Sequence, residues 1–226
     1  MATRPPELVL LDAFGTLVEM EPPAPILAAS LEDAGHPVDV ATVQRALLVE
    51  IAHYRRRMHI GRDEQGLAAL RAECGVVLAR ELGPGAPDAT LVTALLVDSL
   101  RFRLYDDALP AMDALAAMGI RLGVASNWDC ALPQHLERLG VAGRFEVIAA
   151  SAAVGAAKPD PAIFLHAAAA VGVPPARVMH VGDRRVEDHR GARAAGMRAL
   201  LLDRHGREQG PDVITTLMAL PERLGG

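Results

Sequence analysis

The chain has 226 residues, enough for one large domain or for a domain with a substantial insertion. Its net charge of −5 provides no basic field that would attract nucleic acid or an anionic membrane. Two cysteines, Cys74 and Cys130, form no CxxC pair and no spaced set of metal ligands, which fits a reducing compartment. We find no signal-peptide core and no apolar run of transmembrane length, so we expect a cytoplasmic protein that binds neither nucleic acid nor membrane.

The first predicted element is a strand that leads into an acidic residue. The apolar run 8–11 is typical of a strand buried on both faces, and Asp12 follows it directly. Ligand sites of open α/β sheets lie at the carboxyl ends of their strands. Asp12 is therefore the first candidate functional residue.

Residues 18–104 are predicted to form an insertion made only of helices. Prolines at positions 22, 23 and 25 break regular structure and indicate a linker or hinge. We expect a helix over 26–34 and a longer one that begins after an N-cap at Asp39. Two more helices are expected, over 62–82 and from Asp88 to about residue 100. We find no convincing strand from the prolines to about residue 103.

From residue 105 onward, predicted strands alternate with predicted helices. The strands cover 120–125, 145–149, 177–181 and 198–202, and the helices cover 108–118, 132–139, 161–171, 187–195 and 213–220. This alternation predicts a parallel sheet covered by helices. The expected fold class is therefore α/β, with a doubly wound parallel sheet built from residues 1–17 and 105–226 and interrupted by the helical insertion at 18–104.

Polar residues follow several of these strands. Ser126 ends one strand, Lys158 lies in the loop after the next, and Asp183 follows a third. Strand ends lie side by side in such a sheet, so these residues are expected to converge with Asp12. Asp12, Asp183 and Asp188 would bring like charges together, which requires a compensating cation. Lys158 supplies one positive charge, and Mg²⁺ best fits the remaining oxygen ligands.

Four motifs stand in the order and spacing of a known family. They are Asp12-Ala13-Phe14-Gly15-Thr16, Ser126-Asn127, Lys158-Pro159, and Gly182-Asp183 with Asp188 five residues later. With them the chain resembles the haloacid dehalogenase-like hydrolases over essentially its whole length. The resemblance implies a Rossmann-like core, and it implies that the insertion is the helical cap that closes over the site in this family.

The resemblance also implies roles for individual residues. Asp12 would be the catalytic nucleophile and form an aspartyl intermediate. Lys158 would be the second catalytic residue and would steady both Asp12 and the charge of the substrate. Ser126 and the backbone around Asn127 would bind the transferring group at the substrate site, and Thr16 would help to position the first loop there.

The same resemblance implies a metal site that binds Mg²⁺. Asp12 and Asp183 would be ligands, with Asp188 as a further ligand or as support behind them. The backbone carbonyl of Phe14 would also bind the ion, because a carbonyl does not depend on the identity of the side chain. The expected substrate is a small, anionic molecule.

Phe14 departs from the pattern of the family's phosphatases, which carry a second Asp at this place. That residue protonates the leaving group, and general acid–base help of this kind is worth about 10²–10⁴-fold in rate. Without this acid, we expect alkyl phosphates to be hydrolysed slowly and aryl phosphates to be hydrolysed faster than alkyl phosphates. The favoured function is a Mg²⁺-dependent phosphatase that acts on a small phosphorylated metabolite.

Two alternatives stay open at this stage. The family's 2-haloacid dehalogenases have an aromatic residue at the position of Phe14, which indicates metal-independent carbon–halogen hydrolysis. They carry neutral polar residues where this chain has Asp183 and Asp188, and this argues for the phosphatase. The second alternative is a non-catalytic homologue that binds a phosphorylated ligand, but the retained Asp12 and Lys158 argue against it.

A few other residues have two interpretations each. His180 lies within a predicted strand and is expected to be a packed core histidine rather than a ligand. Arg184 and Arg185 either reach an anionic substrate or form a solvated basic pair. Trp128 either lines the pocket or only packs.

Overall fold

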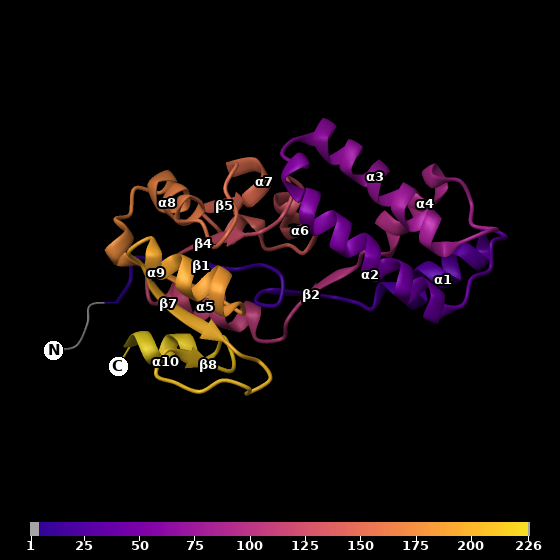
Figure 1. Ribbon diagram of the computed structural model, residues 1–226. Coiled ribbons are helices and arrows are strands. Elements are labelled where there is room, and N and C mark those ends of the chain that lie inside the picture. Colours follow the sequence, from indigo (N-terminus) through magenta and orange to yellow (C-terminus); the bar gives the residue numbers. More distant parts are fainter. Residues whose placement is uncertain (1–4, 226) are drawn as a thin grey trace. The chain divides into compact units, whose positions relative to one another are not determined.

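The computed structural model describes residues 5–225 of the chain. It divides into two compact units (Figure 1), one that combines Met1–Glu19 with Arg103–Gly226 and one formed by Met20–Phe102. The first is an α/β unit and the second is helical. Among the described residues, each helix is too short or too polar to span a lipid bilayer.

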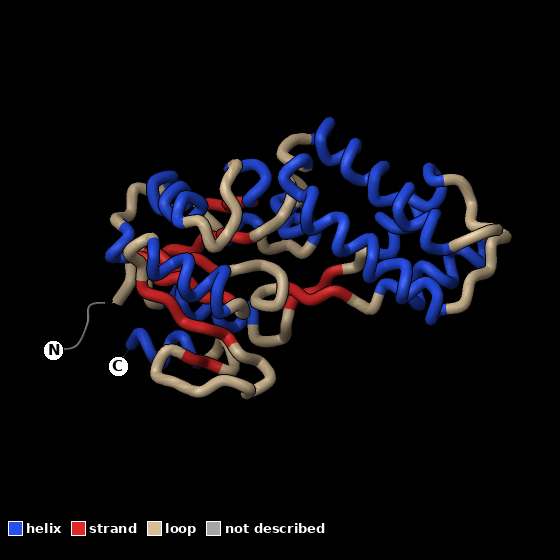
Figure 2. The backbone as a smooth tube through the Cα atoms, viewed as in Figure 1, coloured by secondary structure: helices blue, strands red, loops and turns tan. Residues whose placement is uncertain are grey.

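The α/β unit is built on a parallel sheet, drawn in red in Figure 2. Within residues 5–225 the sheet has six strands, in the order β5-β4-β1-β6-β7-β8. The chain therefore leaves β1 toward one edge and later returns to the other side of β1, which is the kind of switch point where ligand sites form. The strands are β1 (Leu8–Leu11), β4 (Arg121–Ser126), β5 (Val147–Ala150), β6 (Val178–Gly182), β7 (Arg198–Leu202) and β8 (Val213–Ile214).

Strand β1 is buried on both faces, as its apolar sequence predicts. Leu8 and Leu10 belong to a core cluster that includes Phe164 of α8 (Pro161–Ala170). Successive side chains of a strand point to opposite faces, so Val9 and Leu11 face the other layer. The parallel sheet with flanking helices confirms the predicted fold class.

Helices of the α/β unit lie close to the predicted positions. Helix α8 begins as expected, because Asp160 accepts a hydrogen bond from Ala162 N and Pro161 occupies the first turn. The short helix α7 was not predicted. The remaining helices are α5 (Ala108–Ala117), α6 (Leu132–Arg138), α7 (Ser151–Val154), α9 (Gly191–Ala194) and α10 (Ala219–Gly225).

The predicted closing helix over 213–220 is wrong. Val213 and Ile214 form β8 and pair in parallel with β7, as suits two β-branched residues. Asp107 then accepts hydrogen bonds from Thr216 Oγ1 and Leu217 N, which bends the chain. The helix starts only at Ala219. Hydrogen bonds between residues more than 100 positions apart therefore override the local preference for a helix.

The predicted helix over 187–195 also differs in the structure. Arg185–Arg190 is a π-helical segment, and α9 follows it as a separate short helix. Asp188 lies in the π-helical segment and is completely buried. Single π turns are often found at functional sites.

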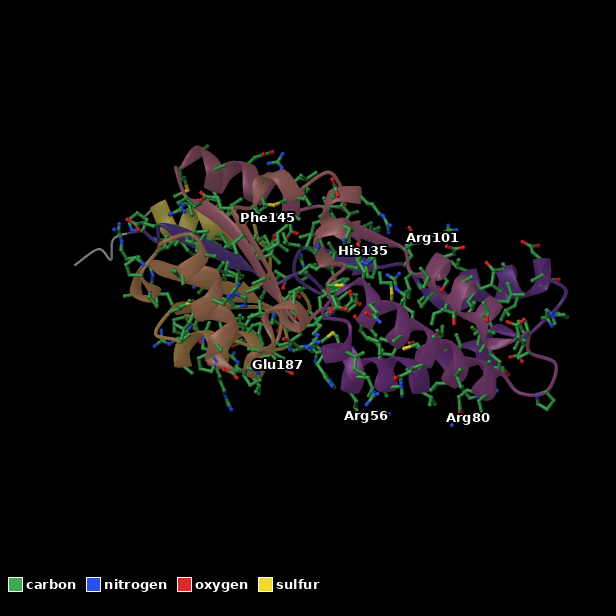
Figure 3. The ribbon with its side chains drawn as sticks, turned by 90° about the horizontal axis from the view of Figure 1, so that it is seen from above. Arg56, Arg80, Arg101, His135, Phe145 and Glu187 are labelled. Atoms are coloured by element: carbon green, nitrogen blue, oxygen red, sulfur yellow. The ribbon has the colours of Figure 1, made fainter. Side chains whose placement is uncertain are left out.

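The helical unit contains the helices that the sequence predicts. Asp39, Asp63 and Asp88 cap three of them, each accepting hydrogen bonds from backbone N–H groups of the first turn. Their apolar faces share a core that includes Leu27 and Leu70. Arg56 and Arg80, labelled in Figure 3, are exposed side chains of the second and third helices. The helices are α1 (Pro23–Asp33), α2 (Val40–Arg57), α3 (Glu64–Leu82) and α4 (Ala89–Ser99).

Two expectations for the insertion are wrong. Pro23 and Pro25 lie in the first turn of α1 instead of in a linker, which is possible because the first turn needs no N–H from them. Two short strands were also missed, since three residues are too few to show a periodic pattern. They are β2 (Val18–Met20) and β3 (Phe102–Leu104), which pair with each other.

Candidate active site

The carboxyl ends of the central strands bring the predicted nucleophile and its partners together. Asp12 follows β1 directly, and Ser126 is the last residue of β4. Ser126 Oγ donates a hydrogen bond of 2.8 Å to Asp12 Oδ1. Lys158, from the loop before α8, reaches the same oxygen with Nζ at 2.5 Å. These three residues therefore converge as the strand-end argument predicts.

Lys158 is a buried ammonium group held between two carboxylates. Its side chain is 3% exposed, and Nζ lies 2.5 Å from Asp12 Oδ1 and 2.5 Å from Asp188 Oδ1. Burial acts to lower the pKa of Lys158, but the charges of Asp12 and Asp188 outweigh it and raise this pKa above its ordinary value. Lys158 therefore stays charged at neutral pH.

Asp188 receives three hydrogen-bond donors. Lys158 Nζ and His180 Nε2 reach Oδ1, the latter at 2.9 Å, and Arg184 N reaches Oδ2 at 2.9 Å. Burial favours the neutral acid, but the charge of Lys158 and the contact with His180 hold the pKa of Asp188 well below its usual range. Gly182 is needed beside it, because a Cβ there would lie 2.2 Å from the Asp188 carboxyl carbon.

Asp183 is the more accessible acid of the site. It follows β6, and its side chain is 31% exposed. Burial and then the charges of Asp12 and Asp188 raise the pKa of Asp183 to about 6. Its Oδ1 atom is buried and has no hydrogen-bond partner among residues 5–225. The loop after β1 packs on this carboxylate, since a Cβ at Gly15 would lie 2.6 Å from Asp183 Oδ2.

The three acids form a group that suits a hard divalent cation. Asp12, Asp183 and Asp188 each offer a carboxylate oxygen, and these oxygens lie within 4.8 Å of one another. Among the described residues, Lys158 is the cationic side chain that pairs with both Asp12 and Asp188, so negative charge remains in excess. Burial also raises the pKa of Asp12, although Lys158 and Ser126 oppose the rise. A second cation would favour the ionised form of Asp12, and oxygen ligands suit Mg²⁺.

The three acids differ in how many carboxylate lone pairs remain free to bind a metal ion. A carboxylate has about four lone-pair positions, and donors among the described residues already occupy three of those of Asp188. Asp183 Oδ1 has no such donor among the described residues. The geometry thus favours Asp12 and Asp183 as direct ligands and Asp188 as the anchor of Lys158. The carbonyl of Phe14 stays a prediction.

Asn127 uses its side chain to hold the backbone of Lys158. Nδ2 donates to Lys158 O at 3.0 Å, and Oδ1 accepts from Lys158 N at 2.7 Å. Both polar groups of this amide are therefore engaged in positioning the lysine loop. Substrate binding by the backbone around Asn127 stays a prediction.

Thr16 is completely buried. Its Oγ1 atom has no hydrogen-bond partner in the part of the chain that the structure describes, and its carbonyl accepts a hydrogen bond of 2.7 Å from Arg204 Nη2. Arg204 also forms a bidentate pair with Asp107 and lies 3.8 Å from the ring centroid of Tyr105. These contacts fit the predicted role of Thr16 in positioning the first loop, and the sequence carries no signal for Arg204.

Phe14 is not a core residue, because it is 42% exposed. Its ring makes an edge contact with Trp128 at 6.4 Å between centroids. The ring of Trp128 lies 5.7 Å from that of His135 in α6, a residue labelled in Figure 3. The position where phosphatases carry an acid therefore presents an aromatic edge beside the nucleophile loop.

Arg184 and Arg185 are both engaged with acidic side chains. Arg185 pairs with Glu208 and Asp212, and Arg184 Nε lies 3.9 Å from Asp183 Oδ2. A cavity of about 330 Å³ opens beside Asp183 and is lined by Gly15, Tyr105, Arg204 and His205, among others.

Comparison with known proteins agrees with this architecture. The model of the haloacid dehalogenase-like hydrolase family matches residues 6–196. Phosphoserine phosphatase from Thermus thermophilus is 32% identical over 232 residues, covering 91% of this chain and 92% of that protein. Haloacid dehalogenase-like hydrolase domain-containing protein 3 from Mus musculus is 31% identical over 207 residues, covering 86% of this chain and 81% of that protein. The solved structure of a 2-haloacid dehalogenase from Pseudomonas syringae is 28% identical, with a TM-score of 0.65 over 97% of this chain and 98% of that chain.

Proposed function

The chain belongs to the haloacid dehalogenase-like hydrolases, and from this premise we propose that it is a Mg²⁺-dependent phosphatase with Asp12 as its nucleophile. It is a hydrolase, and its relatives named as phosphatases favour phosphate ester hydrolysis over dehalogenation. The proposed substrate is a small phosphorylated metabolite.

The observation that carries this proposal is the placement of Asp183 beside Asp12. Burial and two neighbouring carboxylates disfavour the ionised form of Asp183 and raise its pKa to about 6. A cation bound there would favour the ionised form. The unpartnered buried oxygen of Asp183 supports the same conclusion. A haloacid, whose own carboxylate is negative, would meet additional repulsion at this place.

The proposed chemistry follows from the contacts of Asp12. The two donors to this side chain among the described residues, Lys158 Nζ and Ser126 Oγ, reach Oδ1, so Oδ2 is the oxygen proposed to attack phosphorus. The bond from phosphorus to the leaving oxygen breaks as the aspartyl phosphate forms, and water then releases inorganic phosphate from Asp12.

The metal would be held by Asp12 and Asp183 with the Phe14 carbonyl. When bound, Mg²⁺ would offset the negative charge of the phosphoryl oxygens. Lys158 would keep Asp12 oriented through the attack, and Ser126 would hold the transferring group as well as Asp12.

Phe14 sets the proposed preference among leaving groups. Its side chain has no proton to give, so the leaving oxygen must depart as an anion and take its proton from water. Aryl oxide ions leave far more easily than alkoxides. The exposed ring of Phe14 and its contact with Trp128 also place apolar surface near the nucleophile loop, where an aromatic leaving group would pack.

The test is hydrolysis of para-nitrophenyl phosphate with Mg²⁺ and after its removal by chelation. We expect phosphate release that requires Mg²⁺ and falls to background in Asp12→Asn. Asp113→Asn is the control, because Asp113 lies outside the four motifs and its side chain is 63% exposed. Full activity without the metal, or an active Asp12→Asn variant, would contradict the proposal.

Dehalogenation is the second candidate, and Phe14 is the observation that favours it. The similarity to the Pseudomonas syringae dehalogenase adds support. Halide release from 2-chloropropionate that continues in the presence of a chelator would establish this function in place of the first. Binding of phosphorylated compounds without either turnover would instead favour the non-catalytic alternative.

A further inference from the structure

His180 belongs to a buried chain of contacts that ends at the nucleophile. It lies in β6 and is completely buried. Its Nε2 atom is 2.9 Å from Asp188 Oδ1, the same oxygen that Lys158 Nζ reaches at 2.5 Å. Lys158 Nζ also contacts Asp12 Oδ1 at 2.5 Å. His180 is thus three contacts away from Asp12, through Asp188 and Lys158, and it does not line the reaction site itself.

The surroundings of His180 are otherwise apolar. Its ring makes an edge contact with Phe164 at 4.9 Å between centroids. In the sheet it stands beside Leu10 of β1 and Ala199 of β7. Its Nδ1 atom is buried without a hydrogen-bond partner among the described residues. An unpaired buried polar atom costs stability, and the hydrogen bond from Nε2 to Asp188 is what the ring provides in return.

A buried polar atom left unpaired violates a folding rule, and such violations are expected at functional sites. Asp188 depends on His180 for one of two donors to Oδ1. The other donor to that oxygen is Lys158, whose own position matters for Asp12. We propose that His180 is a positioning residue, which fixes the Asp188 carboxylate so that Asp188 in turn holds Lys158 against Asp12. This rests on the proposed role of Asp12 as nucleophile.

The chemistry predicts a particular pattern of kinetic change. His180 touches neither the substrate nor the reacting atoms, so its loss should leave KM nearly unchanged. Lys158 orients the nucleophile, so a mobile Asp188 should lower kcat. Loss of outer partners that orient the groups of an active site typically costs about 10–100-fold, and we expect this loss of kcat in His180→Leu.

Two amide variants separate a positioning role from simple packing. The amide nitrogen of Gln can take the place of His Nε2, whereas the amide nitrogen of the shorter Asn takes the place of Nδ1. His180→Gln should therefore keep kcat within a few-fold of the wild type, while His180→Asn should lose it as His180→Leu does. Met179→Leu is the matched control, since Met179 is the buried preceding residue of β6 and its side chain points to the opposite face of the sheet from His180.

The experiment measures kcat, KM and the thermal unfolding midpoint of these four variants and the wild type. Each protein is assayed with para-nitrophenyl phosphate and Mg²⁺ and with 2-chloropropionate, because Asp12 is the nucleophile in both reactions. We expect His180→Leu to remain folded, with an unfolding midpoint well above the assay temperature, while its kcat falls. Glutamine should restore kcat and asparagine should not.

The failure of each proposal gives a different result. If the wild type turns over either substrate through Asp12 but kcat is equal in His180→Gln and His180→Asn, the positioning role is wrong. It is also wrong if kcat falls only in parallel with the unfolding midpoint, because that is a packing defect. A wild type that turns over neither substrate would overturn the proposed function and, with it, the role of His180. If His180→Leu does not fold, the kcat values of His180→Gln and His180→Asn still decide whether His180 has a positioning role.

Discussion

Lys158 Nζ contacts Asp12 Oδ1 at 2.5 Å, although the two residues are 146 positions apart in the chain. The contact joins the loop after the central strand to the loop before α8. Both side chains are nearly inaccessible, at 3% and 6% exposure. A buried ion pair of this kind is expensive to form, and removal of one partner leaves the other charge uncompensated.

Substitution of Lys158 by Met should therefore reduce stability as well as activity. Asp12 and Asp188 would lose their shared cation, and we expect a decrease in the free energy of unfolding of about 3–5 kcal/mol. Urea unfolding at pH 7 measures it. The second substitution Asp188→Asn, added to Lys158→Met, should recover part of the loss. A single variant within about 1 kcal/mol of the wild type, the range of exposed pairs, would contradict the buried pair.

Introduction of an acid at Phe14 should change the choice of leaving group. Phe14→Asp places a carboxyl group where the family's phosphatases carry one, and we expect kcat/KM for alkyl phosphates to rise by about 10²-fold or more. The value for aryl phosphates should change little. Phe14→Asn is the control, because its amide is similar in size but cannot act as the acid. Equal rates for the two variants on an alkyl phosphate would mean that another group supplies the proton.

Gly15 should not tolerate a side chain. Its φ of +86° is unfavourable for other residues, and an added Cβ would lie 2.6 Å from Asp183 Oδ2. Gly15→Ala is expected to lower Mg²⁺ affinity, measured by titration calorimetry, as well as stability. Gly140→Ala is the matched control, because Gly140 has a φ of +73° but no atom within 4 Å of an added Cβ. Both variants should share the backbone cost of about 1–2 kcal/mol. If they also lose Mg²⁺ affinity equally, the steric argument fails.

Asp107 should make stability depend on pH. Burial acts against its ionised form, but hydrogen bonds from Arg204, Thr216 and Leu217 N outweigh it and hold the pKa of Asp107 below its ordinary value. A carboxyl group with a lowered pKa stabilises the fold above its unfolded pKa, and this contribution is lost as the pH falls through the folded pKa.

Asp107→Asn is accordingly expected to lower the free energy of unfolding at pH 7 by about 1–3 kcal/mol, the cost of unsatisfied buried partners. The difference from the wild type should narrow as the pH is lowered to about 3, below the ordinary carboxyl pKa. Urea unfolding at both pH values measures it. Asp113→Asn is the control, since Asp113 pairs with Arg144 at the surface. A difference that is the same at both pH values would contradict the ionic role of Asp107.

The sequence alone was sufficient for the fold class and for the convergence of Asp12, Ser126 and Lys158. Buried strands are visible as apolar runs, and parallel strands place the residues that follow them at one edge of the sheet. The helix starts at Asp39, Asp88 and Asp160 were equally visible, because a cap and its hydrogen-bond partner are close in sequence.

Only the tertiary structure decided the features that depend on contacts between distant residues. The bend that replaces the predicted closing helix is made by Asp107, more than 100 positions earlier. The exposure of Phe14 and the capture of the Asn127 side chain by Lys158 were likewise invisible in the sequence pattern. His180 resembles any core residue of a strand until the π-helical segment turns Asp188 back toward it. Periodicity records which face of an element is buried, but it carries no information about which polar atom that face will meet.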